Sequence, residues 1–175
     1  MIFEKAKQYQ DFVKSITPKI AEILGIKSRS LRVIMTSTLE LPTLALTHGR
    51  SIFLNSEWFK KHPDDYGTIV HEIAHAVMDI QVAIEEEKWI IEGLADYVRY
   101  ILGYPSKTGG LPKYDAKRLF KGYQYTAHFF LWLRERYGET EIKEISKRIS
   151  EGKTFDVEKL KSRLKEYEQE QNKTK

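Results

Sequence analysis

The stretch TIVHEIAHAVM, at residues 68–78, is apolar at nearly every position. Read as a helix, it is apolar almost all the way round, which is typical of a helix buried on all sides. Three polar side chains nevertheless interrupt it, at His71, Glu72 and His75. Because a polar group is costly to bury without a partner, these three residues need a specific reason to be there.

A metal ion supplies that reason. His71 and His75 are one helical turn apart and project from the same face, so both imidazoles can reach one ion. Glu72 lies beside that face and can take a proton from a water held there without being a ligand. The H-E-x-x-H pattern therefore predicts a zinc site with Glu72 as the catalytic base. The alternative is a pair of hydrogen-bonded core histidines.

The third metal ligand is expected from the next helix, where WIIEGLADY at residues 89–97 places two acids in an apolar stretch. A catalytic zinc takes three protein ligands and keeps one position open. Glu92 is the predicted third ligand, and Asp96, on the same face, is predicted to bind the far nitrogen of a ligating histidine. Gly93 lets the two helices approach closely. Alternatively, Glu92 caps its helix and Asp96 pairs with Arg99.

The rest of the sequence predicts an α+β fold in which a small antiparallel sheet of about three strands packs on helices. Strands are expected near 31–35, 43–47 and 51–55, with a hairpin turn at 48–50. Helices are expected at 3–25, 56–61, 63–79, 89–102, 115–137, 139–151 and 155–170, with a charged link at 85–88 and a loop at 103–113. Pro18 should kink or split the first helix, Gly25 should cap it, and Ser56 should cap the second.

The 175 residues predict one domain, with an N-terminal helix and sheet (1–55), active-site helices (56–137), and C-terminal helices with a tail frayed from Gln169. The net charge of +4 is spread among interleaved acids, which disfavours a nucleic-acid partner. The chain has no cysteine, which excludes a Cys-ligated zinc finger. It shows no signal peptide and no apolar run long enough to span a membrane, so a cytoplasmic location is expected.

Three blocks together resemble a known family. HEIAH at 71–75, EGLADYVR at 92–99 and GYQYTAHF at 122–129 are similar to motifs of gluzincin metallopeptidases, and most closely of the basic secretory protein family of plants and bacteria. The resemblance covers about residues 50–135. It implies a zincin-like domain with one zinc ion on His71, His75 and Glu92, and Glu72 as general base.

The resemblance also implies an edge strand above the site that pairs with an extended peptide or protein substrate, for which 51–55 is the candidate. The chain departs from the family pattern at Val77-Met78, where a Trp-Gln pair is usual, and at His128, where arginine is usual. Family members are usually secreted and carry a leader, which this chain does not show.

The predicted reaction is hydrolysis of a peptide bond, which needs a hydrogen-bond donor for the oxyanion besides the metal. Tyr123 is the first candidate, with Tyr125 and His128 as alternatives; Tyr123 can equally be a core aromatic. Two other functions stay open. The metal can be a structural staple in a non-catalytic zinc-binding protein, or the enzyme can be latent, with residues 155–175 lying in the cleft until they are removed.

Overall fold

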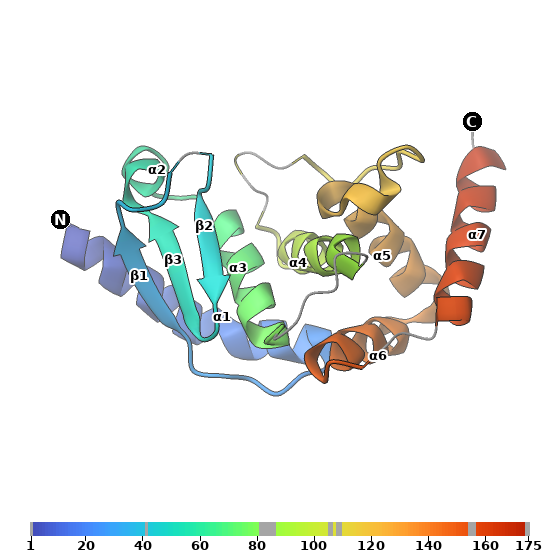
Figure 1. Cartoon of the computed structure of the whole chain (residues 1–175), viewed down its shortest axis with the longest axis horizontal. Coiled ribbons are helices and arrows are strands. Elements are labelled where there is room, and N and C mark those ends of the chain that lie inside the picture. Colours follow the sequence, from blue (N-terminus) through green and yellow to red (C-terminus); the bar gives the residue numbers. More distant parts are fainter. Residues whose placement is uncertain are drawn as a thin grey trace.

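The computed structural model describes residues 2–40, 42–80, 87–104, 107, 110–153 and 157–173, with the main chain alone at 2, 3 and 157. Its elements are α1 (Ile2–Leu24), β1 (Arg32–Thr36), β2 (Ala45–His48), β3 (Ser51–Asn55), α2 (Ser56–Lys61), α3 (Tyr66–Met78), α4 (Lys88–Ile101), the 3-10 helix η2 (Leu119–Lys121), α5 (Tyr123–Tyr137), α6 (Glu139–Ser150) and α7 (Val157–Lys173). The sheet lies at one end and α7 at the other, with α3 and α4 between them (Figure 1). The predicted α+β class is confirmed.

The sheet has the strand order β1-β3-β2 and is mixed rather than wholly antiparallel. β2 and β3 form the predicted hairpin, with His48 opposite Ser51 and a two-residue turn at Gly49-Arg50. β3 then runs parallel to β1, with Arg32 opposite Ser51. The prediction that 51–55 is an edge strand is therefore wrong, because this segment is the central strand and β2 is the edge strand beside α3.

Several helix ends differ from the sequence expectations. α1 is unbroken through Pro18, and Gly25 ends it at a φ of 65° as expected. Asn55, not Ser56, caps α2, because its Oδ1 accepts from the amides of Glu57 and Trp58. α3 begins at Tyr66 instead of Pro63, since the Asp65 side chain accepts from the amide of Thr68.

The C-terminal half shows two further differences. α5 begins at Tyr123 rather than at 115, because Gly122 has a φ of 81°, outside the helical region, and a short 3-10 helix precedes it. α7 stays helical through Lys173, so the tail is not frayed from Gln169. The predicted link at 85–88 and the loop at 103–113 lie partly outside the described residues.

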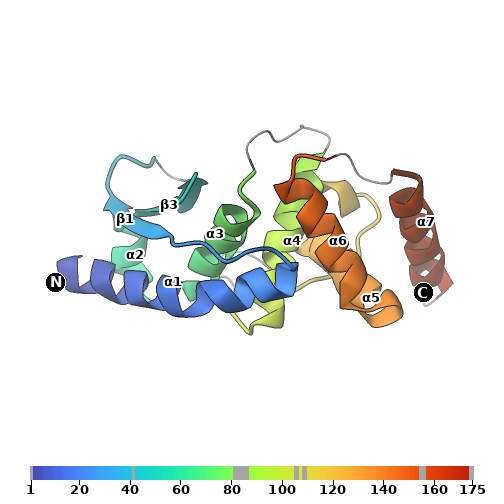
Figure 2. The same ribbon diagram turned by 90° about the horizontal axis from the view of Figure 1, so that it is seen from below.

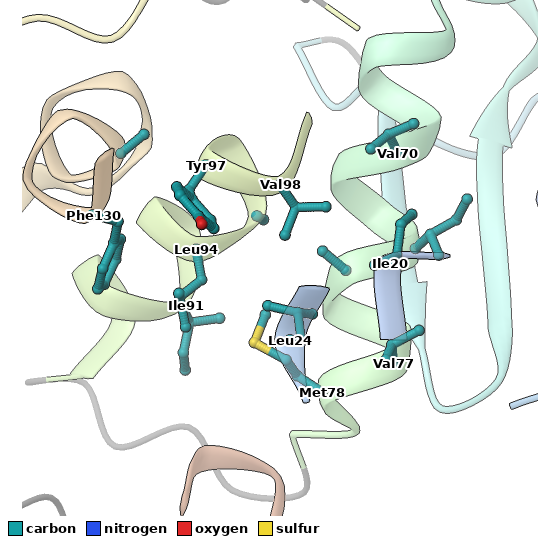
Figure 3. Close-up of a cluster of buried hydrophobic side chains, with 14 of the residues drawn as sticks. Ile20, Leu24, Val70, Val77, Met78, Ile91, Leu94, Tyr97, Val98 and Phe130 are labelled. Carbon is teal, nitrogen blue, oxygen red and sulfur yellow. The ribbon is translucent and has the colours of Figure 1, made fainter. Parts of the chain in front are cut away.

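α3 is buried as its sequence predicts. α1 runs along one side of both the sheet and α3 (Figure 2). In the core close-up, the α3 side chains Val70, Val77 and Met78 and side chains of α1 lie together on one side of α4, and Phe130 of α5 lies on the other (Figure 3). Val77 and Met78, where the chain departs from the family pattern, are fully buried. This packing fixes α3 and α4 side by side, and the polar residues of 71–75 lie between them.

Candidate metal centre

Three side chains meet between α3 and α4. His71 and His75 come from successive turns of α3, and their Nε2 atoms are 2.9 Å apart. From α4, Glu92 places its Oε2 atom 3.1 Å from Nε2 of His71 and 3.5 Å from Nε2 of His75. All three candidate ligand atoms lie within 4.8 Å of one another. The structure thus brings together the residues predicted to hold the metal.

The spacing of these atoms fits a zinc ion. Tetrahedral zinc with bonds of about 2.0–2.1 Å to nitrogen and oxygen places its ligand atoms about 3.3 Å from one another. The observed separations of 2.9, 3.1 and 3.5 Å lie on either side of that value. The side chains of His71, His75 and Glu92 are 12%, 15% and 27% exposed, so an ion among them would remain reachable from solvent.

Asp96 lies behind His71, one turn along α4 from Glu92. The Nδ1 atom of His71 is 2.8 Å from Oδ1 of Asp96, so the Nε2 atom is left to face the ligand cluster. The second oxygen, Oδ2, accepts from Nη2 of Arg99 at 2.7 Å. Asp96 therefore makes both contacts that the sequence offered as alternatives. A buried arginine holds the carboxylate, and the carboxylate orients the histidine.

The cluster perturbs its own charges. Burial alone would lower the pKa of His71, but hydrogen bonds to Asp96 and Glu92 outweigh it and raise that pKa to about 10. Burial would raise the pKa of Glu92, and its contacts with His71 and His75 instead lower it. Without a cation, one proton on a histidine partly balances the carboxylates. A divalent ion could replace that proton.

Glu72 is buried beside the cluster, with an exposed fraction of 9%. Its Oε2 atom accepts a hydrogen bond from Oγ1 of Thr47 at 2.8 Å, and the same hydroxyl lies 2.9 Å from the main-chain oxygen of Glu72. Thr47 belongs to β2, which packs against α3. Sequence reasoning missed Thr47, because no motif marks it and its role depends on how β2 packs on α3.

The three candidate oxyanion donors lie in different places. The ring of Tyr123 is nearly parallel to that of His71, with centroids 6.0 Å apart. Burial and the charges of Glu92 and Asp96 raise the pKa of Tyr123 to about 12. Tyr125 also lines the cleft and accepts from Nη1 of Arg118 at 2.6 Å. His128 instead lies 2.8 Å from the Tyr167 hydroxyl, away from the cleft lining.

A cleft of about 1020 Å³ surrounds the cluster. Its walls come from the segment 42–49 that includes β2, from α3 and α4, and from the first turn of α5. His48 is exposed and lines this cleft. No described residue of α7 lines it, and α7 packs on α5 instead. The described part of the C-terminal segment therefore does not block the cleft, contrary to the latent-enzyme hypothesis.

Comparisons with known proteins give a family. The model of a family described as peptidase of plants and bacteria matches residues 5–161. Comparisons with curated proteins and with solved structures gave no match. Among the described residues, no helix combines the length and apolar character needed to cross a membrane. Because the match spans most of the chain and includes the whole His71, His75 and Glu92 cluster, the chain belongs to this family of peptidases of plants and bacteria.

Proposed function

We propose that this protein is a zinc-dependent peptidase in which His71, His75 and Glu92 hold the ion and Glu72 is the general base. The family supports the peptidase reaction, and the cluster of three ligand atoms open to a cleft supports the metal. The observation that carries the proposal is the cluster together with Glu72, a buried acid next to His71 in the sequence. The substrate is a peptide or protein.

The chemistry divides between the ion and the chain. When bound, zinc polarises the scissile carbonyl and lowers the pKa of a coordinated water. Glu72 accepts a proton from the attacking water and then delivers it to the leaving amine. Tyr123 donates a hydrogen bond from its hydroxyl to the oxyanion. Its raised pKa keeps that hydroxyl protonated at neutral pH. Asp96 holds His71 with its Nε2 toward the ion.

β2 is the strand to which we assign the extended substrate. The amide of Asn55 donates to the oxygen of Leu44, which makes 44 and 55 a hydrogen-bonded pair. Such pairs alternate along an antiparallel ladder, so Leu46 and His48 also direct their main-chain groups to β3. Ala45 and Thr47 consequently direct theirs to the open edge beside the cleft. A peptide can pair with this edge by β-augmentation.

A structural zinc site is the competing function. Structural sites are commonly closed by four protein ligands, often cysteines. Here the three candidate ligands face a large cleft, and the chain has no cysteine. These features favour a catalytic site over a structural one.

The test measures bound zinc and cleavage of a mixed peptide library for the wild type, for Glu72→Gln, and for Glu57→Gln, a matched control at an exposed side chain of α2. We expect about one zinc per chain in all three, since none removes a ligand. Cleavage should be lost only in Glu72→Gln. Zinc in every protein with cleavage in none would favour the structural site. A wild type that binds no zinc would refute the metal assignment.

A further inference from the structure

Thr47 connects the edge strand to Glu72. Its Oγ1 atom is 2.8 Å from the carboxylate oxygen Oε2 of Glu72 and 2.9 Å from the main-chain oxygen of the same residue. A threonine hydroxyl has one proton, so these two contacts form one shared donor interaction. The hydroxyl thereby ties the end of the Glu72 side chain to its own main chain and limits the positions that the carboxylate can adopt.

The position of Thr47 on β2 adds a second connection. By the alternation of the β2–β3 ladder, the main-chain groups of Thr47 point to the open edge where a substrate strand would pair. Its side chain meanwhile reaches α3. Thr47 thus belongs to the strand proposed to receive the substrate and also contacts Glu72, the acid beside the metal cluster.

We propose that Thr47 is a positioning residue, which holds the Glu72 carboxylate in register with a substrate paired to β2. This inference rests on the proposed peptidase function. Catalysis requires the base within hydrogen-bond reach of the proton it takes. A glutamate side chain has three rotatable bonds, and the Thr47 hydroxyl restricts the positions that the buried Glu72 carboxylate can adopt.

The substitution Thr47→Val tests the inference, because valine keeps the branched shape and removes only the hydroxyl. We expect kcat to fall about 10- to 100-fold, a part of the effect of well-placed general-base catalysis. KM should stay within about twofold, because the main chain of β2 still pairs with the substrate. Thr47→Ser retains the hydroxyl and should keep kcat within about threefold of the wild type.

Thr36→Val is the matched control, since it makes the same change at the opposite edge of the sheet, where the hydroxyl contacts Thr38. Zinc content and the thermal midpoint of each variant establish that it is folded and loaded. Thr47→Ala provides a second hydroxyl-free variant in case valine disturbs the packing of β2.

The outcomes separate the two proposals. If the wild type cleaves and Thr47→Val has the same kcat, or if Thr47→Ser loses as much as Thr47→Val, the positioning role is wrong and the peptidase function stands. If the zinc-loaded wild type cleaves no better than Glu72→Gln, the proposed function itself fails, and the role of Thr47 fails with it.

Discussion

Replacing Gly93 by alanine should disturb the candidate metal centre without changing any of its residues. Gly93 lies on α4, next to Glu92, and its nearest neighbours are on α5 rather than on α3, where the sequence prediction put them. A Cβ atom there would lie 2.4 Å from Cγ2 and 2.5 Å from Cβ of Thr126, and 3.2 Å from Cε2 of Phe130. Ordinary van der Waals contacts begin at 3.4 Å, so the two helices would have to separate by about 1 Å.

The expected cost follows from this overlap. Overpacking a close contact costs about 1–3 kcal/mol. The Thr126 side chain is fully buried and its hydroxyl is anchored to the main-chain oxygen of Leu119, which places the cost near the upper end. Alanine recovers about 1 kcal/mol over glycine within a helix. The net loss of about 2 kcal/mol corresponds to a fall of about 4–8 °C in Tm for a chain of this size.

The measurement combines thermal unfolding of the metal-free protein with zinc affinity, from competition with a chromophoric chelator. We expect weaker zinc binding in Gly93→Ala, because Glu92 moves with α4 while His71 and His75 stay on α3. The double variant Gly93→Ala/Thr126→Gly removes the clashing atoms and should restore part of the affinity. A Gly93→Ala variant with wild-type Tm and zinc affinity would refute the claim that this contact positions Glu92, the proposed third ligand.

Three further predictions concern individual side chains of the site. Asp96→Asn should weaken zinc binding about 10- to 100-fold, because the carboxylate that orients His71 is lost, and the chelator competition measures this. In the metal-free protein the pKa of His71 is raised to about 10. Zinc binding at pH 8 should therefore release about one proton, and affinity should rise about tenfold per pH unit up to that pKa. Calorimetry in buffers of different ionisation enthalpy counts the protons, and a count of zero would contradict a protonated His71. Tyr123→Phe should lower kcat about 100-fold and leave zinc affinity unchanged, since it removes only the hydroxyl proposed to bind the oxyanion; steady-state kinetics with an unchanged kcat would exclude Tyr123 from the reaction.

The parts of the fold that the sequence predicted well are those set by local pattern. The apolar residues of 68–78 predicted a buried helix, because a surface helix of that length would show a polar face in its sequence. The helix end at Gly25 and the hairpin turn at 48–50 were also predicted, since glycine is the residue that adopts a positive φ most easily. The pairing of His71 with His75 followed from helical spacing, which fixes relative position over one turn. Glu92 was predicted because a catalytic zinc needs a third ligand and the next helix has an acid in an apolar stretch.

Two features that were misplaced or missed depend on tertiary contacts, and a third depends on a single glycine. Strand order cannot be read from alternation, because a central and an edge strand of this length have similar patterns, and 51–55 was therefore misplaced. The start of α5 was missed because Gly122 sits within an otherwise helical pattern. Thr47 is a single polar residue on a short strand, and only the packing of β2 against α3 gives it a partner.

The close contact between α4 and α5 explains why two separate sequence blocks accompany the H-E-x-x-H segment. Gly93 gives α5 room to approach α4, and Gly122 completes that approach from the other side, since a Cβ atom on Gly122 would lie 2.8 Å from Cβ of Glu92. Gly122 also takes a positive φ, which places the following residue, Tyr123, beside His71. Each glycine thus acts on the partner helix, so the blocks at 92–99 and 122–129 form one unit. A substitution of either glycine is therefore expected to move both Glu92, the proposed third ligand, and Tyr123, the candidate oxyanion donor.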